Sequence, residues 1–180
     1  MGPEFEELHE HAEHAAHNPS MAPVSLSMAI LSVAVAIVSM LGVRSHTEEV
    51  TLQSRANDKW SYYQAKDIRL HMDKDIADLE SFINTSDPAK AAAARQANLA
   101  EAEKYRKQIE ELQTDAKRLE EETNLQGRRG DRYDFGEIFL EVALVITSIT
   151  LLSGRRVFWH TGIVLGIIGV AVACTALLIR

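Results

Sequence analysis

The chain has 180 residues, of which 46% are apolar, with a formal net charge of −7 and a single cysteine, Cys174. An acidic balance without a basic patch excludes a typical nucleic-acid-binding protein, and one cysteine excludes a disulfide framework. The apolar residues gather in three long runs, so little of the chain is left for a separate globular domain.

Residues 1–19 form an acidic tail that contains several histidines. His11, His14 and His17 are spaced three apart, which places them near one another on a helix. A metal- or pH-responsive module is one interpretation, but tetrahedral sites usually draw ligands from more than one element. A solvated tail whose histidines gain charge at mildly low pH is the favoured interpretation. We therefore predict no metal site and no cofactor.

Residues 20–43 are predicted to be the first transmembrane helix, because the run from Met21 to Val43 carries no charge and is long enough to cross a bilayer. Small residues recur along it at intervals of four and three and predict a helix-packing stripe, since small side chains let backbones approach closely in lipid. This stripe comprises Ser25, Ala29, Ser32, Ala36 and Ser39.

Residues 44–132 are rich in charge and are predicted to form an antiparallel helical hairpin with its turn near 84–88, where Asp87 caps the return helix. The outgoing helix has an apolar stripe in its distal half, and the return helix has a coiled-coil heptad pattern. We expect the stretch Gly127–Gly130 to end the return arm. The outgoing stripe is Ala65, Ile68, Met72, Ile76, Leu79 and Ile83, and the return pattern is Ala102, Tyr105, Ile109, Leu112, Ala116, Leu119 and Thr123.

An aromatic block occupies the proximal half of the outgoing helix, at Trp60, Tyr62 and Tyr63. Two interpretations stay open for it. It is either a contact with another subunit or protein partner, or plain packing inside the hairpin.

Residues 133–153 and 157–180 are predicted to be the second and third transmembrane helices, joined by a tight turn at 154–156. Each again carries a stripe of small residues. The predicted fold class is therefore all-α, with three transmembrane helices and a coiled-coil-like hairpin inserted between the first and second. The stripes are Ala143, Thr147 and Thr150 in the second span, and Gly162, Gly166, Gly169 and Ala173 in the third.

The second span also carries two acids, Glu137 and Glu141. Glu141 lies eight residues beyond Tyr133, about 12 Å along the helix axis, and a carboxyl at that depth is a functional-site hypothesis. Glu137, Glu141 and Ser148 share the face opposite the small residues, so sister subunits would have to cover it. The alternative is that Glu141 reaches the interface or pairs with an arginine at the same end.

The orientation follows from the basic residues near the ends of the spans. Those on the hairpin side outnumber the pair Arg155 and Arg156 on the other side, which predicts a cytoplasmic hairpin and C-terminus and a periplasmic N-terminus. The hairpin-side residues are Arg44, Arg55, Lys59, Arg128, Arg129, Arg132 and Arg180.

The run from His11 through Gln53, and above all the block from Asn57 to Lys66 with Trp60, Tyr62, Tyr63 and Gln64, resembles a bacterial family of uncharacterised membrane proteins, domain of unknown function 4337. The resemblance covers essentially the whole chain. It implies a bacterial inner-membrane protein and brings no activity, substrate or catalytic residue.

No catalytic set and no phosphate-binding glycine loop is present in the sequence. We therefore expect a non-enzymatic, homo-oligomeric inner-membrane protein whose hairpin is a scaffold or an arm for a protein partner. The alternative function is an oligomeric cation channel or proton-linked transporter that uses Glu141, with Glu137 and Ser148 as further candidates for the ion or proton path.

Overall fold

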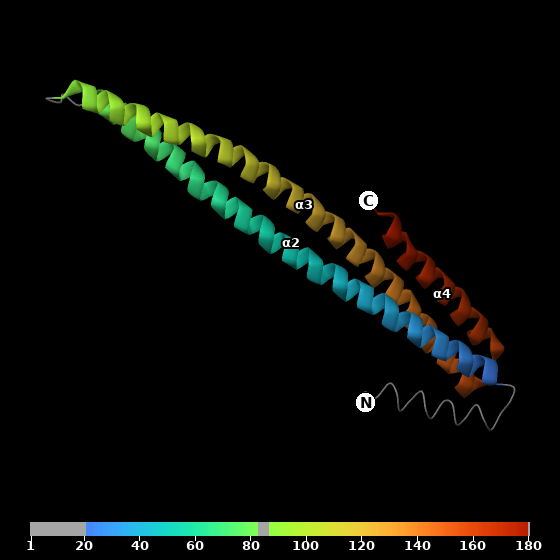
Figure 1. The fold of residues 1–180 in the computed structure, drawn as a ribbon. Coiled ribbons are helices and arrows are strands. Elements are labelled where there is room, and N and C mark those ends of the chain that lie inside the picture. The colour runs from blue at the N-terminus through green and yellow to red at the C-terminus, as the bar shows by residue number, and fades with distance from the viewer. Residues whose placement is uncertain (1–20, 83–86, 180) are drawn as a thin grey trace. The chain divides into compact units, whose positions relative to one another are not determined.

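The computed structural model describes residues 21–82 and 87–179, and every regular element in these ranges is a helix. Helix α2 spans Ala22–Phe82, α3 spans Pro88–Ser153, and α4 spans Arg156–Thr175, followed by the short 3-10 helix η1 at Ala176–Leu178. Helices α2 and α3 run antiparallel (Figure 1). The predicted all-α fold with three long helices is confirmed.

Both helix boundaries that the sequence marks most clearly lie where expected. The Asp87 carboxylate accepts a hydrogen bond from the Lys90 backbone N–H at 3.1 Å, and Pro88 begins α3. Between α3 and α4, Gly154 has a φ of +68°, and its N–H donates to the Thr150 carbonyl at 2.8 Å. Glycine adopts this left-handed conformation without steric cost, so the chain reverses within two residues.

Helix α3 passes through Gly127–Gly130 without a break. The return arm ends close to this stretch, at Asn124, but the helix itself continues into the following segment. Gly130 is buried, and a Cβ atom there would lie 2.6 Å from the His46 ring. The glycine therefore permits the close approach of α2 at this point and does not stop the helix. The same His46 lies 3.0 Å from the Asp134 carboxylate through its Nε2 atom.

The chain forms two compact units. Among the described residues, the first, here called the spanning unit, consists of residues 21–48 and 125–179, and the second, here called the arm, consists of residues 49–82 and 87–124. Helices α2 and α3 each contribute to both units. Each of α2, α3 and α4 with η1 contains a segment long and apolar enough to cross a membrane.

In the spanning unit, glycines bring α3 and α4 into backbone contact. A Cβ atom at Gly136 would lie 2.9 Å from the Gly169 carbonyl oxygen, and a Cβ atom at Gly169 would lie 2.9 Å from the Gly136 carbonyl oxygen. One turn further along each helix, Leu140 and Ala173 belong to the buried cluster that also holds Leu31 and Val38 of α2. The three helices therefore share one core, built around a glycine crossing.

The outer surface of the spanning unit is apolar on all three helices. A water-soluble bundle would bury much of this surface, whereas lipid tails accept it. The burial pattern therefore suits a lipid environment. The side chains that illustrate it are between 52% and 64% exposed: Leu26, Ile30, Val33 and Ile37 of α2, Ile138 and Val145 of α3, and Val164 and Ile167 of α4.

In the arm, α2 and α3 pack through two matched heptad patterns, here called the arm seam. The α3 side of the seam is the predicted return pattern, extended by Asn98. The α2 side does not use the predicted apolar stripe. It uses a different face of α2, along which apolar and charged residues alternate for most of its length. Its members are all buried or half-buried: Leu52, Ala56, Lys59, Tyr63, Lys66, Leu70, Asp73, Ala77 and Glu80.

Three of the charged residues on the α2 side of the seam have partners on α3. Lys59 donates to the Asp115 carboxylate at 2.8 Å, and the Lys66 ammonium lies 4.7 Å from the centre of the Tyr105 ring. Farther along, the Asn98 amide donates to both carboxylate oxygens of Glu80 at 3.3 Å. Partly exposed contacts of this kind add little stability, but they select one register of the two helices.

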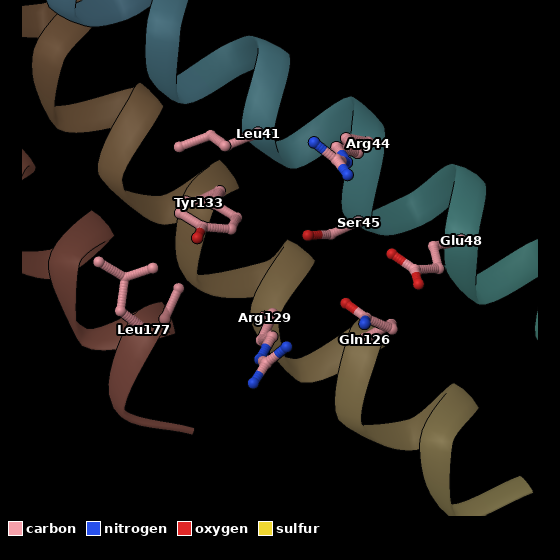
Figure 2. A pocket seen from close by; sticks show the side chains of 9 residues that line it. Leu41, Arg44, Ser45, Glu48, Gln126, Arg129, Tyr133 and Leu177 are labelled. Atoms are coloured by element: carbon pink, nitrogen blue, oxygen red, sulfur yellow. The ribbon is translucent and has the colours of Figure 1, made fainter. Parts of the chain in front are cut away.

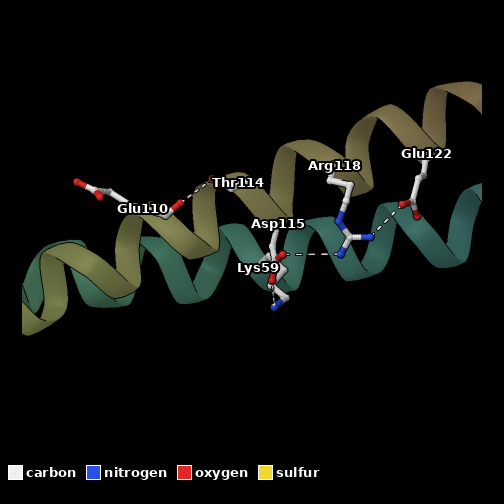
Figure 3. A network of polar contacts seen from close by, with 6 residues as sticks. All are labelled: Lys59, Glu110, Thr114, Asp115, Arg118 and Glu122. Atoms are coloured by element: carbon white, nitrogen blue, oxygen red, sulfur yellow. Dashed lines mark hydrogen bonds and ion pairs between the residues drawn. The ribbon is translucent and has the colours of Figure 1, made fainter.

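The Lys59–Asp115 pair continues into a network along α3 (Figure 3). Arg118 lies 3.7 Å from Asp115 and donates to Glu122 at 3.0 Å. The hydrogen bond from Lys59 lowers the pKa of the Asp115 carboxyl below its ordinary value. A carboxyl with a lowered pKa in the folded state stabilises the fold at neutral pH, and this contribution disappears as the pH falls through that pKa.

Candidate interaction surface

The apolar stripe predicted on the outgoing helix is exposed along the arm. Ile68, Met72, Ile76, Leu79 and Phe82 are between 38% and 84% exposed, and Ala65 is exposed as well. Ile83, the last predicted member, lies outside the described residues. These six described residues, from Ala65 to Phe82, are here called the outer stripe.

The outer stripe lies on the opposite side of α2 from the arm seam. At 100° per residue, Met72 projects about 160° away from Leu70, and Leu70 is buried against Ala102 and Ile109 of α3. The arm thus uses the mixed apolar and charged face of α2 for its own folding and leaves the more apolar face uncovered. Contiguous apolar surface that a protein leaves exposed is a candidate for an interaction site.

The aromatic block is divided between the arm interior and the surface. The Trp60 indole N–H donates to the Glu120 carboxylate at 2.7 Å, and the Trp60 ring stands edge-on to Tyr63 with centroids 5.3 Å apart. Tyr63 packs against the buried cluster around Leu70, whereas Tyr62 is 63% exposed. Trp60 and Tyr63 therefore pack inside the hairpin, and only Tyr62 is available to another molecule.

The acids of the second span lie on its outer side. Glu141 is exposed and Glu137 and Ser148 are half-buried, and the Ser148 hydroxyl donates to the Val145 carbonyl of its own helix at 2.7 Å. Within the described residues neither acid has a hydrogen-bonding or ion-pairing partner, so Glu141 pairs with neither Arg44 nor Arg132. Its exposed neighbours Ile138 and Val145 belong to the apolar outer surface.

The predicted small-residue stripes occupy different positions in the three spans. In α3, Ala143, Thr147 and Thr150 are fully buried. In α4, the whole stripe of Gly162, Gly166, Gly169 and Ala173 is buried.

In α2, by contrast, the buried line consists of larger residues, Val24, Met28, Leu31 and Val38. The small-residue stripe borders this line: Ser25, Ala29, Ser32 and Ser39 are half-buried, and Ala36 is exposed. Gly136 was not predicted to be a packing residue, although its spacing of seven residues from Ala143 on the buried face of α3 was an available signal.

Most hydroxyl groups of the spanning unit bond within their own helix. Thr147 donates to the Ala143 carbonyl at 2.7 Å, and Ser32 donates to the Met28 carbonyl at 3.0 Å. The Trp159 indole N–H donates across helices to the Ser27 hydroxyl at 2.8 Å. This bond joins the start of α4 to the start of α2.

The tail histidines His11, His14 and His17 lie outside the described residues. Among residues 21–82 and 87–179, no group of three or more His, Cys, Asp or Glu side chains is arranged to hold a metal ion.

Comparison with known protein families identifies a matching family. The model of a family described as a domain of unknown function, DUF4337, matches residues 20–179. No match was found among curated proteins or among solved structures.

Proposed function

The chain belongs to the DUF4337 family, whose description names no activity, and we propose that it is a non-enzymatic, homo-oligomeric scaffold of a bacterial inner membrane with the arm as its interaction element. The observation that carries this proposal is the outer stripe, a line of large apolar side chains on an otherwise charged arm. A folded hairpin in water gains nothing from exposing them, so their role lies in contacts with another molecule.

The occupant that fits the outer stripe best is the same stripe of a second copy. Copies inserted in one membrane with one orientation project their arms in the same direction, so two α2 helices meet in parallel around a twofold axis. The members from Ile68 to Leu79 recur at intervals of four, four and three residues, which suits helix-to-helix packing. Confinement to a membrane raises the effective concentration of the arms, so even a short stripe supports association.

The orientation of the assembly follows from its charges. Arg44, Arg128, Arg129 and Arg132 flank the spans on the arm side, against Arg155 and Arg156 at the α3–α4 turn. The positive-inside rule therefore places the arm in the cytoplasm.

Replacing both Met72 and Leu79 with glutamate is expected to dissociate the assembly. Each replacement removes about 1–2 kcal/mol of apolar burial per copy and brings like charges together across the twofold axis. A weakening of the dimer by at least about 100-fold follows. The measurement is the mass of the full chain in nanodiscs or mild detergent as a function of concentration.

The matched control replaces Val50 and Leu99, which are exposed on the arm outside the outer stripe, with glutamate, and it is expected to keep the parent mass. Two results contradict the proposal: a parent chain that is monomeric throughout, or an equal loss of association in both double variants.

A second candidate function, an oligomeric cation or proton pathway, is favoured by the exposed carboxyl of Glu141 beside Ile138 and Val145. A carboxyl facing acyl chains costs a few kcal/mol, and facing sister subunits around an axis would relieve that cost and form an acidic ring. Liposomes that contain the parent are expected to conduct cations, and Glu141→Gln is expected to reduce the flux at least about tenfold. Thr161→Ala, which changes an exposed hydroxyl of α4 outside that face, is the control. If the parent does not conduct, or Glu141→Gln conducts equally well, this candidate fails.

A further inference from the structure

An open pocket of about 280 Å³ lies in the spanning unit and is lined by residues of α2, α3 and η1 (Figure 2). It is smaller than the roughly 300–1,000 Å³ of sites for drug-sized molecules, so its size suits a small polar group. The residues that line the pocket form three layers, one helical turn apart, which differ in polarity and charge.

The inner layer is apolar and the middle layer is cationic. Leu41 and Leu177 lie at the inner end together with Tyr133 (Figure 2). One turn farther along, Arg44 of α2 and Arg129 of α3 both line the pocket, and the Arg129 guanidinium is turned toward the chain after η1. Arg44 is the first charged residue after the charge-free run from Met21 to Val43. The cationic layer therefore stands where the hydrocarbon core ends and the phosphate groups of lipids begin.

The two arginines are held differently. The Nε and Nη2 atoms of Arg129 donate to the Ile179 carbonyl at 3.3 and 2.9 Å, which fixes the guanidinium and leaves other N–H groups free to donate. Arg44 has no hydrogen-bonding or ion-pairing partner in the described parts of the chain. The hydroxyl of Ser45, a residue that is 8% exposed, lies between them in the pocket wall. One fixed and one available guanidinium with a nearby hydroxyl form a suitable set of donors for a phosphate group.

The outer layer carries the opposite charge. Glu48 lies one turn beyond Arg44 on α2, and Gln126 lies one turn beyond Arg129 on α3 (Figure 2). Glu48 forms no ion pair with either arginine, nor with any other described residue. A carboxylate at this place repels a purely anionic headgroup and attracts a cationic group that extends outward from the phosphate.

The order of the layers, apolar, then cationic, then anionic, matches the order of parts in a phospholipid with an amine headgroup. We propose that this pocket binds a phosphoethanolamine headgroup, with Arg44 and Arg129 on the phosphate, Glu48 on the ammonium, and Leu41 and Leu177 beside the upper acyl chains. Phosphatidylglycerol lacks the ammonium. Phosphatidylcholine has a cationic headgroup but no N–H groups to donate to Glu48. We therefore expect both phosphatidylglycerol and phosphatidylcholine to bind less tightly than phosphatidylethanolamine. This inference rests on the membrane insertion in the proposed function but not on the oligomeric state.

The test is lipid retention by the full chain, measured by native mass spectrometry after exchange into micelles with equal amounts of phosphatidylethanolamine, phosphatidylcholine and phosphatidylglycerol. The parent is expected to retain phosphatidylethanolamine about tenfold over the other two, the equivalent of one charge-assisted contact. Arg44→Gln is expected to reduce its retention about tenfold, and Glu48→Gln to remove the preference over phosphatidylglycerol. Arg132→Gln changes an exposed arginine outside the pocket and is expected to leave retention unchanged.

Equal retention of the three lipids by the parent, or equal effects of Arg44→Gln and Arg132→Gln, would overturn the inference. Water-soluble glycerophosphoethanolamine at millimolar concentration is expected not to displace the lipid. If it does, the site takes free phosphate esters and the assignment to lipid is wrong. The same spectra report the subunit number, so a monomer that prefers phosphatidylethanolamine would end the homo-oligomer proposal and leave the lipid site standing.

Discussion

Replacing Gly169 with leucine is expected to prevent α4 from packing on α3. The new Cβ atom would lie 2.9 Å from both the Gly136 carbonyl oxygen and the Leu140 Cγ atom. Because a backbone carbonyl cannot rotate away as a side chain does, the two helices would have to separate. Separation would open the core cluster around Leu140 and Ala173.

The expected cost is about 3 kcal/mol or more, the upper part of the range for overpacked cores, which corresponds to a fall of about 6–12 °C in the unfolding temperature. The measurement is thermal unfolding in nanodiscs, followed by the fluorescence of Trp159, which bonds to Ser27 across the helices. Gly136→Leu changes the α3 side of the same helix crossing. It is expected to lower the unfolding temperature by a similar amount, since its Cβ would lie 2.8 Å from the Ala173 Cβ.

The matched control for this experiment is Ala171→Leu. Ala171 lies two residues from Gly169 on the exposed side of α4, so the same side chain is added to the same helix but points away from α3. It is expected to change the unfolding temperature by less than about 2 °C. Equal effects of Gly169→Leu and Ala171→Leu would show that α3 and α4 do not cross at the glycines.

The sequence predicted the architecture because its strongest signals are local. Charge-free runs, the caps at Asp87 and Gly154, and the regular return pattern from Ala102 to Thr123 depend on nearby residues alone. The glycines of the third span were also recognisable, since small residues at four-three spacing have few other uses in lipid. By contrast, the residue four positions after Gly136 is the large Leu140, and the next small residue on that face, Ala143, lies seven positions away, so the role of Gly136 depends on where α4 crosses.

The hydropathy pattern of α2 does not predict which of its faces packs against α3 in the arm. The more apolar line, from Ala65 to Phe82, points outward, and the buried line includes Lys59, Lys66 and Glu80. Those charged residues have partners on α3. The hydropathy pattern of α2 alone contains no information about partners on another helix. The polar pocket was missed for the same reason, because Arg44, Arg129 and Leu177 come from three separate parts of the chain.

Two substitutions on neighbouring positions of α2 are expected to separate folding of the arm from association of the arms. Leu70→Asp places a carboxylate in the cluster with Ala102 and Ile109, where charge is costly to bury, and it is expected to destabilise the arm by about 3 kcal/mol. Ile68→Asp places the same carboxylate on the outer stripe, where Ile68 is 66% exposed. It is expected to leave the fold of a single arm intact and to weaken only the contact between copies.

Amide hydrogen exchange of the full chain in nanodiscs distinguishes the two effects. Leu70→Asp is expected to speed exchange throughout residues 49–124 by about 100-fold, the equivalent of about 3 kcal/mol. With Ile68→Asp, the arm is expected to keep its protection in the monomeric fraction while the mass falls toward that of one chain. The opposite outcome, in which Ile68→Asp unfolds the arm and Leu70→Asp is tolerated, would mean that the more apolar face of α2 packs against α3. The outer stripe would then be the hairpin's own interior, and the scaffold proposal would lose the surface on which it depends.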